Sequence, residues 1–371
     1  MQRCPARPGD PVAMIDTPAL VVDLDPFERN LDLMANAVRG SGIALRPHAK
    51  SHKCPDIAMA QIARGAIGIC CQKVDEAAAF VEAGIRDVLV TNEVVATDKL
   101  ARLAHLAHAA TIGVLVDNIA AVGVLSGAAA AAGVRLDVLV EIDVGAHRCG
   151  AAPGPAVVPL AQAIAGAPGL RFRGLHAYHG GAQHLRTFAE RRAAIAAAAA
   201  LAATTRDALL AAGLACGTVT GAGTGTWQLE RDSGVYTELQ PGSYIFMDAD
   251  YGRNALAPDD HAFEQSLYVL AGVMSVPAPD RAIVDAGLKA FAFDSGPPLV
   301  HAAHGLDYVK ASDEHGVLAV APAEAQPRLG ERVWLIPGHC DPTVNLYDWI
   351  VGVRGAHVEH VWPVAARGAL G

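Results

Sequence analysis

Between residues 43 and 250, short apolar runs alternate with alanine-rich stretches that have helical periodicity. The apolar runs are continuously hydrophobic, which is typical of strands buried on both faces of a parallel sheet that helices cover. They occupy residues 43–46, 67–71, 87–91, 112–117, 136–143, 172–178, 218–221 and 243–247. Eight such strands within about 200 residues predict an α/β fold of the (β/α)₈ barrel type.

The pattern changes after about residue 257, where helical periodicity gives way to alternating β-branched runs between Gly/Pro turns. These runs lie at 266–274, 281–285, 317–320, 332–336, 350–353 and 358–363. They predict a compact, mostly antiparallel β-domain. The early run 19–23 is surplus to the eight barrel strands, so we expect it to pair into this domain. The predicted organisation is a barrel at 25–257 and a discontinuous β-domain at 1–24 plus 258–371.

Charge and cysteine content exclude several classes of partner. The 38 acidic and 29 basic residues give a formal net charge of −9 without basic clusters, which argues against binding to nucleic acid or to an anionic membrane. Seven irregularly spaced cysteines favour a reducing cytoplasm over a disulfide framework. The alanine run 193–203 follows three charged residues, which predicts a packed helix rather than a membrane span. Asp10 and Asp16 do not fit a secretory signal, so we expect a cytoplasmic protein.

Lys50 directly follows the first predicted strand and lies between His48 and His52. A barrel places its active site at the C-terminal ends of its strands. A lysine there can form a Schiff base when burial and positive neighbours lower its pKa. On the local sequence alone, a solvated loop lysine is the simpler interpretation, so other features must decide.

A glycine-rich segment, 220–226, directly follows the seventh predicted strand. Barrels commonly bind phosphate after strands seven and eight, where exposed backbone amides and hydroxyls surround it. The candidate phosphate contacts are Thr220, Gly221, Gly223, Thr224 and Gly225, with Gly242, Ser243 and Tyr244 from the start of the eighth strand. A plain turn is the alternative, and the position after strand seven favours the phosphate site.

Two further strand ends carry candidate cofactor contacts. Arg148, in the segment after the fifth strand, could point into the barrel mouth and hydrogen-bond the ring nitrogen of a pyridine cofactor. The alternative is a surface ion pair with Asp143 or Glu141. The segment 176–184 after the sixth strand holds three histidines, a number that is hard to explain as packing. Tyr178 in the same segment could line the ring or the phosphate.

The segment 337–343 carries a possible metal site. In an extended chain, positions i and i+2 project to the same face, so His339 and Asp341 could converge on one metal while Cys340 points away. An N/O ligand set favours Mn²⁺, Mg²⁺ or Co²⁺, whereas a cysteine ligand would shift the preference toward Zn²⁺. Two adjacent ligand-type residues also occur by chance, so in isolation the pattern is weak.

In this order, the motifs resemble the D-threonine aldolase/D-serine dehydratase family of pyridoxal-phosphate (PLP) enzymes, which share the alanine racemase type III fold. The resemblance covers nearly the whole chain, from 16–20 to 362–368. The motifs that carry it are Arg-Pro-His-x-Lys-x-His-Lys at 46–53, Gly-Ile-Cys-Cys-Gln-Lys at 68–73, Tyr-Thr-Glu-Leu-Gln-Pro-Gly-Ser-Tyr at 236–244, Asp-Ala-Gly-Leu-Lys at 285–289, Asp-Glu-His-Gly at 313–316 and His-Cys-Asp-Pro-Thr at 339–343.

The resemblance implies a role for each candidate. Lys50 is then the Schiff-base lysine of PLP, Arg148 the partner of the pyridine nitrogen, and 221–225 with 242–244 the phosphate site. Gln72 and Tyr178 are expected as further cofactor contacts. A divalent metal on His339 and Asp341, Mn²⁺ in preference to Mg²⁺, Co²⁺ or Zn²⁺, lies near the substrate β-hydroxyl.

The metal pair also suggests the reaction. Dehydratases of the family are expected to carry a His-x-Cys pair and aldolases a His-x-Asp pair, so this chain resembles an aldolase of D-3-hydroxy amino acids. The base is then His184, or a metal-bound hydroxide that His184 positions. The fold type implies a homodimer, with Asp313 reaching the substrate across the interface and His52 as a second substrate contact. A dehydratase, a non-catalytic PLP protein and a racemase are the alternatives. For a substrate with a β-carboxylate, Arg186 or Arg253 could supply the extra cation, although an arginine in such a position is more often a surface residue.

Overall fold

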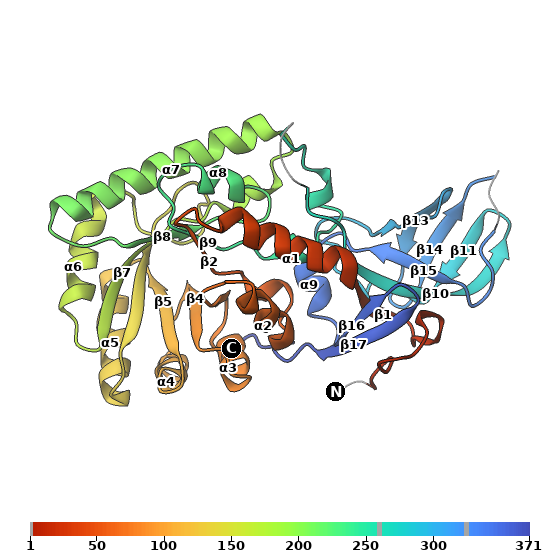
Figure 1. The fold of residues 1–371 in the computed structure, drawn as a ribbon, viewed down its shortest axis with the longest axis horizontal. Helices are drawn as coiled ribbons and strands as arrows, with labels where there is room; N and C mark the ends of the chain where they lie inside the picture. Colours follow the sequence, from red (N-terminus) through yellow and green to blue (C-terminus); the bar gives the residue numbers. More distant parts are fainter. Residues whose placement is uncertain (1–2, 258–261, 323–325) are drawn as a thin grey trace.

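The computed structural model describes residues 3–257, 262–322 and 326–371. Within them, an eight-stranded parallel sheet forms the barrel at the left of Figure 1. Its strands, in spatial order, are β2 (Ala44–Leu45), β9 (Glu238–Leu239), β8 (Thr218–Gly221), β7 (Leu170–His176), β6 (Leu136–Glu141), β5 (Thr111–Val116), β4 (Asp87–Glu93) and β3 (Ile69–Cys71). A parallel bridge between His48 and Cys70 links the two ends of this order and closes the barrel. The predicted barrel fold is confirmed.

Helices surround the barrel and connect its strands (Figure 1). They are α1 (Leu24–Val38), α2 (Pro55–Ala63), α3 (Val74–Glu82), α4 (Thr97–Leu106), α5 (Ile119–Ala132), α6 (Val158–Gly166), α7 (Phe188–Ala211) and α8 (Trp227–Arg231). The strands are buried on both faces, because side chains such as Val138 and Leu139 on β6 are each almost fully covered. This explains why the sequence shows continuous apolar runs.

The predicted eighth strand at 243–247 is wrong. Residues Ser243–Ile245 form a short 3-10 helix, η5, and the eighth barrel strand is β9, which pairs with both β2 and β8. Pro241 has no N–H to donate to a ladder, so the strand ends before it. The apolar residues Tyr244, Ile245 and Phe246 are buried although they form no strand.

α7 is the one described helix that is long and apolar enough to cross a membrane by length and composition. This is weak evidence, because core helices pass the same test. α7 begins with a capping box formed by Thr187 and Glu190, and its buried face, which includes Ile195 and Ala198, packs in the barrel wall. The predicted packed helix is therefore present.

The second sheet lies at the right of Figure 1 and is mostly antiparallel. Its strands are β1 (Ala19–Asp23), β10 (Leu267–Ala278), β11 (Arg281–Val284), β12 (Leu299–Val300), β13 (Leu306–Ala311), β14 (Gly316–Val320), β15 (Arg332–Ile336), β16 (Trp349–Arg354) and β17 (His357–Pro363). β1 pairs antiparallel with β10 and parallel with β16, which confirms that the N-terminal run joins this domain. Strands β12 and β13 were not predicted. The predicted boundary after residue 257 adjoins 258–261, which lie outside the described residues.

The two domains contact each other through α1 and through a short helix, α9 (Cys340–Val344). On α1, the ring of Phe27 lies 6.3 Å from that of Phe246 in the barrel and 6.1 Å from that of Trp362 in the β-domain. α9 lies between the barrel and the second sheet (Figure 1) and contacts the 3-10 turn Ala49–Ser51 that carries Lys50. The β-domain therefore supplies one wall of whatever site the barrel mouth forms.

Candidate active site

A polar pocket opens at the C-terminal ends of the barrel strands, against α9. Its empty volume is about 680 Å³, part of which is open to solvent. The sequence-predicted residues that line it are Lys50, Gln72, Arg148, Tyr178, His184, Gly223, Thr224, Gly242, Ser243, His339 and Asp341. The structure thus brings together most of the predicted site.

Lys50 and Asp341 form an ion pair across the domain junction, with Nζ 3.3 Å from Oδ2. The attraction of Asp341 is the largest effect on Lys50, and it outweighs burial and raises the pKa of the amine. Burial favours a protonated Asp341, but the charges of Lys50 and His339 hold the pKa of its carboxyl well below the usual range. The sequence predicted a lowered pKa for Lys50, and this is wrong because Asp341 was not expected beside it.

The wall near Lys50 has the features of a phosphate cradle. A Cβ on Gly223 would lie 2.5 Å from the side chain of Gln183, and one on Gly242 would collide with Ser51 Oγ. The hydroxyls of Ser51 and Thr224 are buried, and neither has a hydrogen-bond partner among the described residues. Buried hydroxyls without partners are costly, so this wall fits a ligand that accepts hydrogen bonds, such as a phosphate.

Arg148 also lines the pocket. Its Nη2 is 3.4 Å from Glu141 Oε1, and its guanidinium lies 6.0 Å from the centroid of the Tyr178 ring. The ion pair with Glu141, offered as the alternative to a cofactor contact, is therefore present inside the pocket wall. Burial would raise the pKa of the Glu141 carboxyl, but His176 and Arg148 hold it below its usual range. A charged Glu141 then orients the guanidinium at the pocket mouth.

His339 and Asp341 both line the pocket, but the predicted extended conformation is wrong. His339 is the residue before α9, and Asp341 lies in the first helical turn. Pro342 fits this turn because the first helical N–H groups need no intrahelical acceptor, and the Cys340 N–H donates to Asp248 at 2.9 Å. His339 Nδ1 contacts Asp294 Oδ2 at 2.6 Å. In the described parts of the chain no group of three or more His, Cys, Asp or Glu side chains is arranged around a metal.

Comparisons with known proteins agree with this geometry. The model described as "Alanine racemase, N-terminal domain" matches residues 22–250, and "Putative serine dehydratase domain" matches 266–353. The chain is 52% identical over 364 residues to a D-threonine aldolase from Arthrobacter sp., covering 98% of this chain and 96% of that protein. It is 48% identical over 370 residues to a 3-hydroxy-D-aspartate aldolase from Paracoccus denitrificans (strain Pd 1222), covering 98% and 95%.

This chain belongs to the D-threonine aldolase/D-serine dehydratase family. The crystal structure of D-threonine aldolase from Filomicrobium marinum has a TM-score of 0.97 and 51% identity to it, covering 99% of this chain and 100% of that one. A D-threo-3-hydroxyaspartate dehydratase from Delftia sp. (strain HT23) is a more distant relative, 32% identical over 366 residues and 90% of this chain. The alanine racemase-like architecture of the family is thereby confirmed.

Some predicted contacts lie outside the pocket of this family member. They are Thr220, Gly221, Gly225, Tyr244, His52 and Asp313. Most are satisfied elsewhere: the Thr220 hydroxyl donates to Glu238 at 2.8 Å, and the Tyr244 hydroxyl accepts from Gln61 at 3.1 Å. Tyr244 and His52 are fully buried in packing, and Gly221 and Gly225 pack against neighbouring backbone. Asp313 is exposed in the β13–β14 turn of the β-domain, 3.9 Å from Lys289.

Several lining residues were missed as site residues. They are His48, Ser51, Thr91, His176, Gln240 and Tyr251. His48 and Ser51 belong to the Lys50 motif, so proximity in sequence could have found them. The His48 ring lies 2.9 Å from Thr91 Oγ1 and 3.2 Å from Gln72 Nε2, which fixes it beneath the lysine turn. Thr91 and Tyr251 carry no sequence signal, because only the barrel closure brings them to the pocket.

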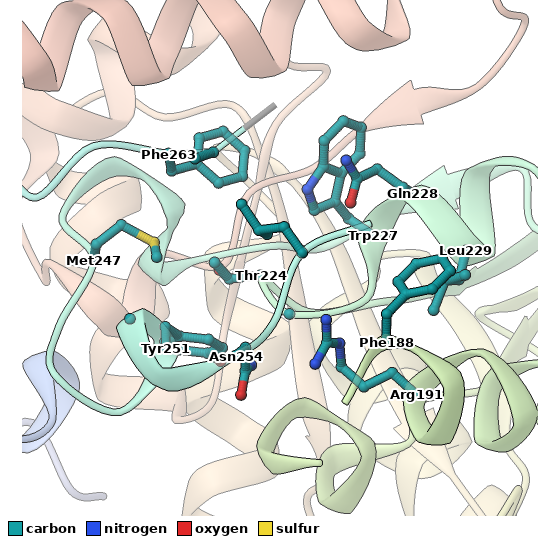
Figure 2. Close-up of a pocket in the computed structure, with 14 residues that line it drawn as sticks. Phe188, Arg191, Thr224, Trp227, Gln228, Leu229, Met247, Tyr251, Asn254 and Phe263 are labelled. Carbon is teal, nitrogen blue, oxygen red and sulfur yellow. The ribbon is translucent and has the colours of Figure 1, made fainter. Parts of the chain in front are cut away.

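A second cavity, mostly apolar, adjoins the first and shares Thr224 and Tyr251 with it. Figure 2 shows the side chains around it, among them Phe188, Trp227 and Phe263. Its wall contains no carboxylate, imidazole or lysine among the described residues. The candidate catalytic residues therefore lie in the first pocket. The second cavity is lined by Thr224 and Gly225 of the glycine-rich segment.

Proposed function

We propose that this chain is a PLP- and divalent-metal-dependent aldolase that cleaves D-3-hydroxy amino acids to glycine and an aldehyde. The observation that carries the proposal is the convergence of Lys50, from the barrel, with His339 and Asp341, from the β-domain, in one pocket. The names of the two relatives near half identity, both aldolases of D-3-hydroxy amino acids, support it.

The pocket residues fit PLP. Lys50 would supply the amine that bonds to the cofactor aldehyde, and the Ser51 and Thr224 hydroxyls with the Gly223 and Gly242 backbone would hold the phosphate. Bound PLP supplies an electron sink for cleavage of a bond at the substrate Cα. Arg148 has only donor groups, so it would donate to the pyridine nitrogen and would keep that nitrogen unprotonated.

His339 and Asp341 would hold the divalent metal, with Mn²⁺ favoured by the N/O donor set, Mg²⁺ or Co²⁺ next and Zn²⁺ less suited. The metal supplies a Lewis acid that lowers the pKa of the substrate β-hydroxyl. Asp294 accepts the Nδ1–H of His339 at 2.6 Å, which leaves Nε2 of that ring for the metal. His184 on the same pocket wall accepts the β-hydroxyl proton.

The nearest alternative is a dehydratase that releases ammonia and a 2-oxo acid from the same substrates. Incubation of the purified enzyme with D-threonine, PLP and Mn²⁺ separates the two. We expect acetaldehyde and glycine in equal amounts without ammonia, and no product from Lys50→Ala. Ammonia with 2-oxobutanoate would instead identify a dehydratase. If D-threonine is not consumed and no product forms, the protein is non-catalytic.

We propose that the preferred substrate has an uncharged side chain, as D-threonine has, rather than the β-carboxylate of D-3-hydroxyaspartate. The lining cations already have carboxylate partners: Lys50 pairs with Asp341 and Arg148 with Glu141. Arg186, a candidate for binding a second carboxylate, donates instead to Asp250 and Asn254. A larger kcat/KM for D-threonine than for D-3-hydroxyaspartate is expected, and the reverse order would refute this choice.

The resemblance to the family also supports a cytoplasmic homodimer with the active site near the subunit interface, with no nucleic-acid or membrane partner. The domain boundaries near residues 24 and 257 belong to the same set of proposals. Light scattering coupled to gel filtration should give twice the 38.3 kDa chain mass. A mass of one chain at micromolar concentration would contradict the homodimer.

A further inference from the structure

Within the part of the chain that the structure describes, the side chain of His184 has one hydrogen-bond partner, the buried carboxylate of Asp250. Its Nδ1 lies 2.6 Å from Asp250 Oδ2, although 66 residues separate the two in sequence. The Asp250 side chain is only 6% exposed, whereas the His184 ring is 50% exposed and lines the pocket. The pair thus consists of a buried carboxylate and an imidazole that is accessible from the pocket.

A third residue, Arg186, donates to the other oxygen of the Asp250 carboxylate. Arg186 Nη2 donates to Asp250 Oδ1, and Arg186 Nη1 donates at 2.8 Å to both the Asp250 carbonyl and Asn254 Oδ1. Burial would raise the pKa of the Asp250 carboxyl, but Arg186 and His184 together hold it below its usual value. Asp250 is therefore a carboxylate, which can only accept hydrogen bonds.

The consequence for His184 is a fixed position of its ring proton. Since the carboxylate only accepts, the proton of a neutral His184 must be on Nδ1, and the lone pair is then on Nε2. A general base needs this lone pair on the nitrogen that faces the substrate. Without Asp250, either nitrogen could carry the proton.

We propose that Asp250, held by Arg186, is a positioning residue that keeps His184 in the Nδ1–H form, so that Nε2 accepts the proton of the substrate β-hydroxyl. This rests on the proposed aldolase function. In the step, the substrate O–H bond breaks and an N–H bond forms at Nε2. The O–H electron pair becomes the second bond of the aldehyde carbonyl as the Cα–Cβ bond breaks, and the electron pair of that bond would be taken up by bound PLP, leaving Cα to be protonated to glycine. The resulting imidazolium is stabilised by the Asp250 carboxylate and returns its proton through the solvent at its exposed edge.

Asp250→Asn is a sharp test because Arg186 is a donor only. The asparagine must turn its oxygen toward Arg186 and its NH₂ toward His184. Nδ1 must then accept a hydrogen bond, so the proton moves to Nε2 and the lone pair toward the substrate is lost. The variant therefore keeps the size and both contacts of Asp250 while reversing the tautomer of His184.

Two measurements are needed, one of them independent of turnover. Protein labelled with ¹⁵N-histidine and kept free of PLP and metal is examined by two-bond ¹H–¹⁵N NMR, and His184 is identified by the signal missing in His184→Gln. We expect the Nδ1–H pattern in the natural chain and the Nε2–H pattern in Asp250→Asn. An Nε2–H pattern in the natural chain would overturn the proposal without any variant.

In the enzyme with PLP and Mn²⁺ bound, Asp250→Asn should lower kcat for D-threonine by about 100-fold or more, the range for loss of a general base. KM and the PLP absorbance spectrum should stay unchanged. The matched control is Asp137→Asn, a carboxylate 13% exposed that pairs with Arg171 at 2.5 Å in the barrel strands, outside the pocket. It should change neither kcat nor the His184 spectrum.

The outcomes separate the two proposals. An Asp250→Asn enzyme with natural kcat, or with the His184 tautomer unchanged, refutes the positioning role while leaving the aldolase function in place. A natural enzyme that releases no aldehyde from D-threonine refutes the proposed function. The NMR result would still show whether Asp250 determines which nitrogen of His184 carries the proton.

Discussion

Ser51→Ala should have two opposite effects, one on the protein without PLP and one on PLP binding. The Ser51 side chain is fully buried next to Lys50, and its hydroxyl has no partner among the described residues. The position of Gly242 leaves room beside it, since a Cβ there would collide with Ser51 Oγ. The hydroxyl can therefore bind a ligand, and without a ligand its burial lowers the stability of the protein.

The magnitudes follow from these two states. A buried hydroxyl without a partner costs about 1–3 kcal/mol, so its removal should raise the free energy of unfolding of the PLP-free protein by up to that amount. A hydrogen bond to a charged phosphate contributes about 1.5–3 kcal/mol, so the same variant should bind PLP roughly 10- to 100-fold more weakly.

Ser266→Ala is the matched control. Ser266 is equally buried, but its hydroxyl donates to the Ile245 carbonyl at 2.6 Å. This variant should lose about 1 kcal/mol of stability, the usual value of one hydrogen bond, and keep its PLP affinity. Urea unfolding after removal of PLP and absorbance titration with PLP measure both quantities. If Ser51→Ala behaves like Ser266→Ala, the hydroxyl has a structural partner and the phosphate assignment is wrong.

Further predictions concern the metal and the buried charges. Asp341→Ala should abolish Mn²⁺-dependent acetaldehyde release and lower Mn²⁺ affinity at least about 10-fold, which dialysis with metal analysis checks, and unchanged metal binding would exclude it as a ligand. Burial raises the pKa of Glu230 from 4.5 to about 8, so between these pH values the folded state keeps a proton that the unfolded state releases. The free energy of unfolding should therefore fall as pH rises through this window. In the natural chain, urea titrations should give a value lower at pH 8 than at pH 5 by on the order of 4 kcal/mol, and Glu230→Gln should remove this difference. If the free energy of unfolding changes with pH by the same amount in both proteins, Glu230 ionises normally.

The barrel could be predicted because most of its strands contain short apolar runs whose burial is a local property of the sequence, although β7 also carries Arg171 and Arg173. The eighth strand could not be predicted in this way. β9 has only two residues, and one of them, Glu238, is charged. Its burial depends on Arg46, whose Nε lies 3.1 Å from Glu238 Oε2 across the β2–β9 pairing. A buried ion pair has no signature in a hydrophobicity pattern, so the apolar run after Pro241 was mistaken for the strand.

The candidate site follows the same division. Lys50, Arg148 and the glycine-rich turn could be placed because each follows a strand, and barrel strands all end at one face. The partners that orient the site could not be placed, because Asp250 and Asp294 lie 66 and 45 residues from the histidines that they contact. Only the fold brings them within hydrogen-bonding distance.

The pKa of Lys50 shows why the two domains act as one site. Considered with its histidine neighbours alone, the amine should lose its proton easily. In the structure the largest effect is instead the charge of Asp341, which belongs to α9 in the other domain. The same carboxylate is the candidate metal ligand, so a bound metal ion would compete with Lys50 for its negative charge. If the proposed roles hold, cofactor attachment at Lys50 and metal binding at Asp341 should influence each other, because α9 brings the two side chains within 3.3 Å across the domain junction.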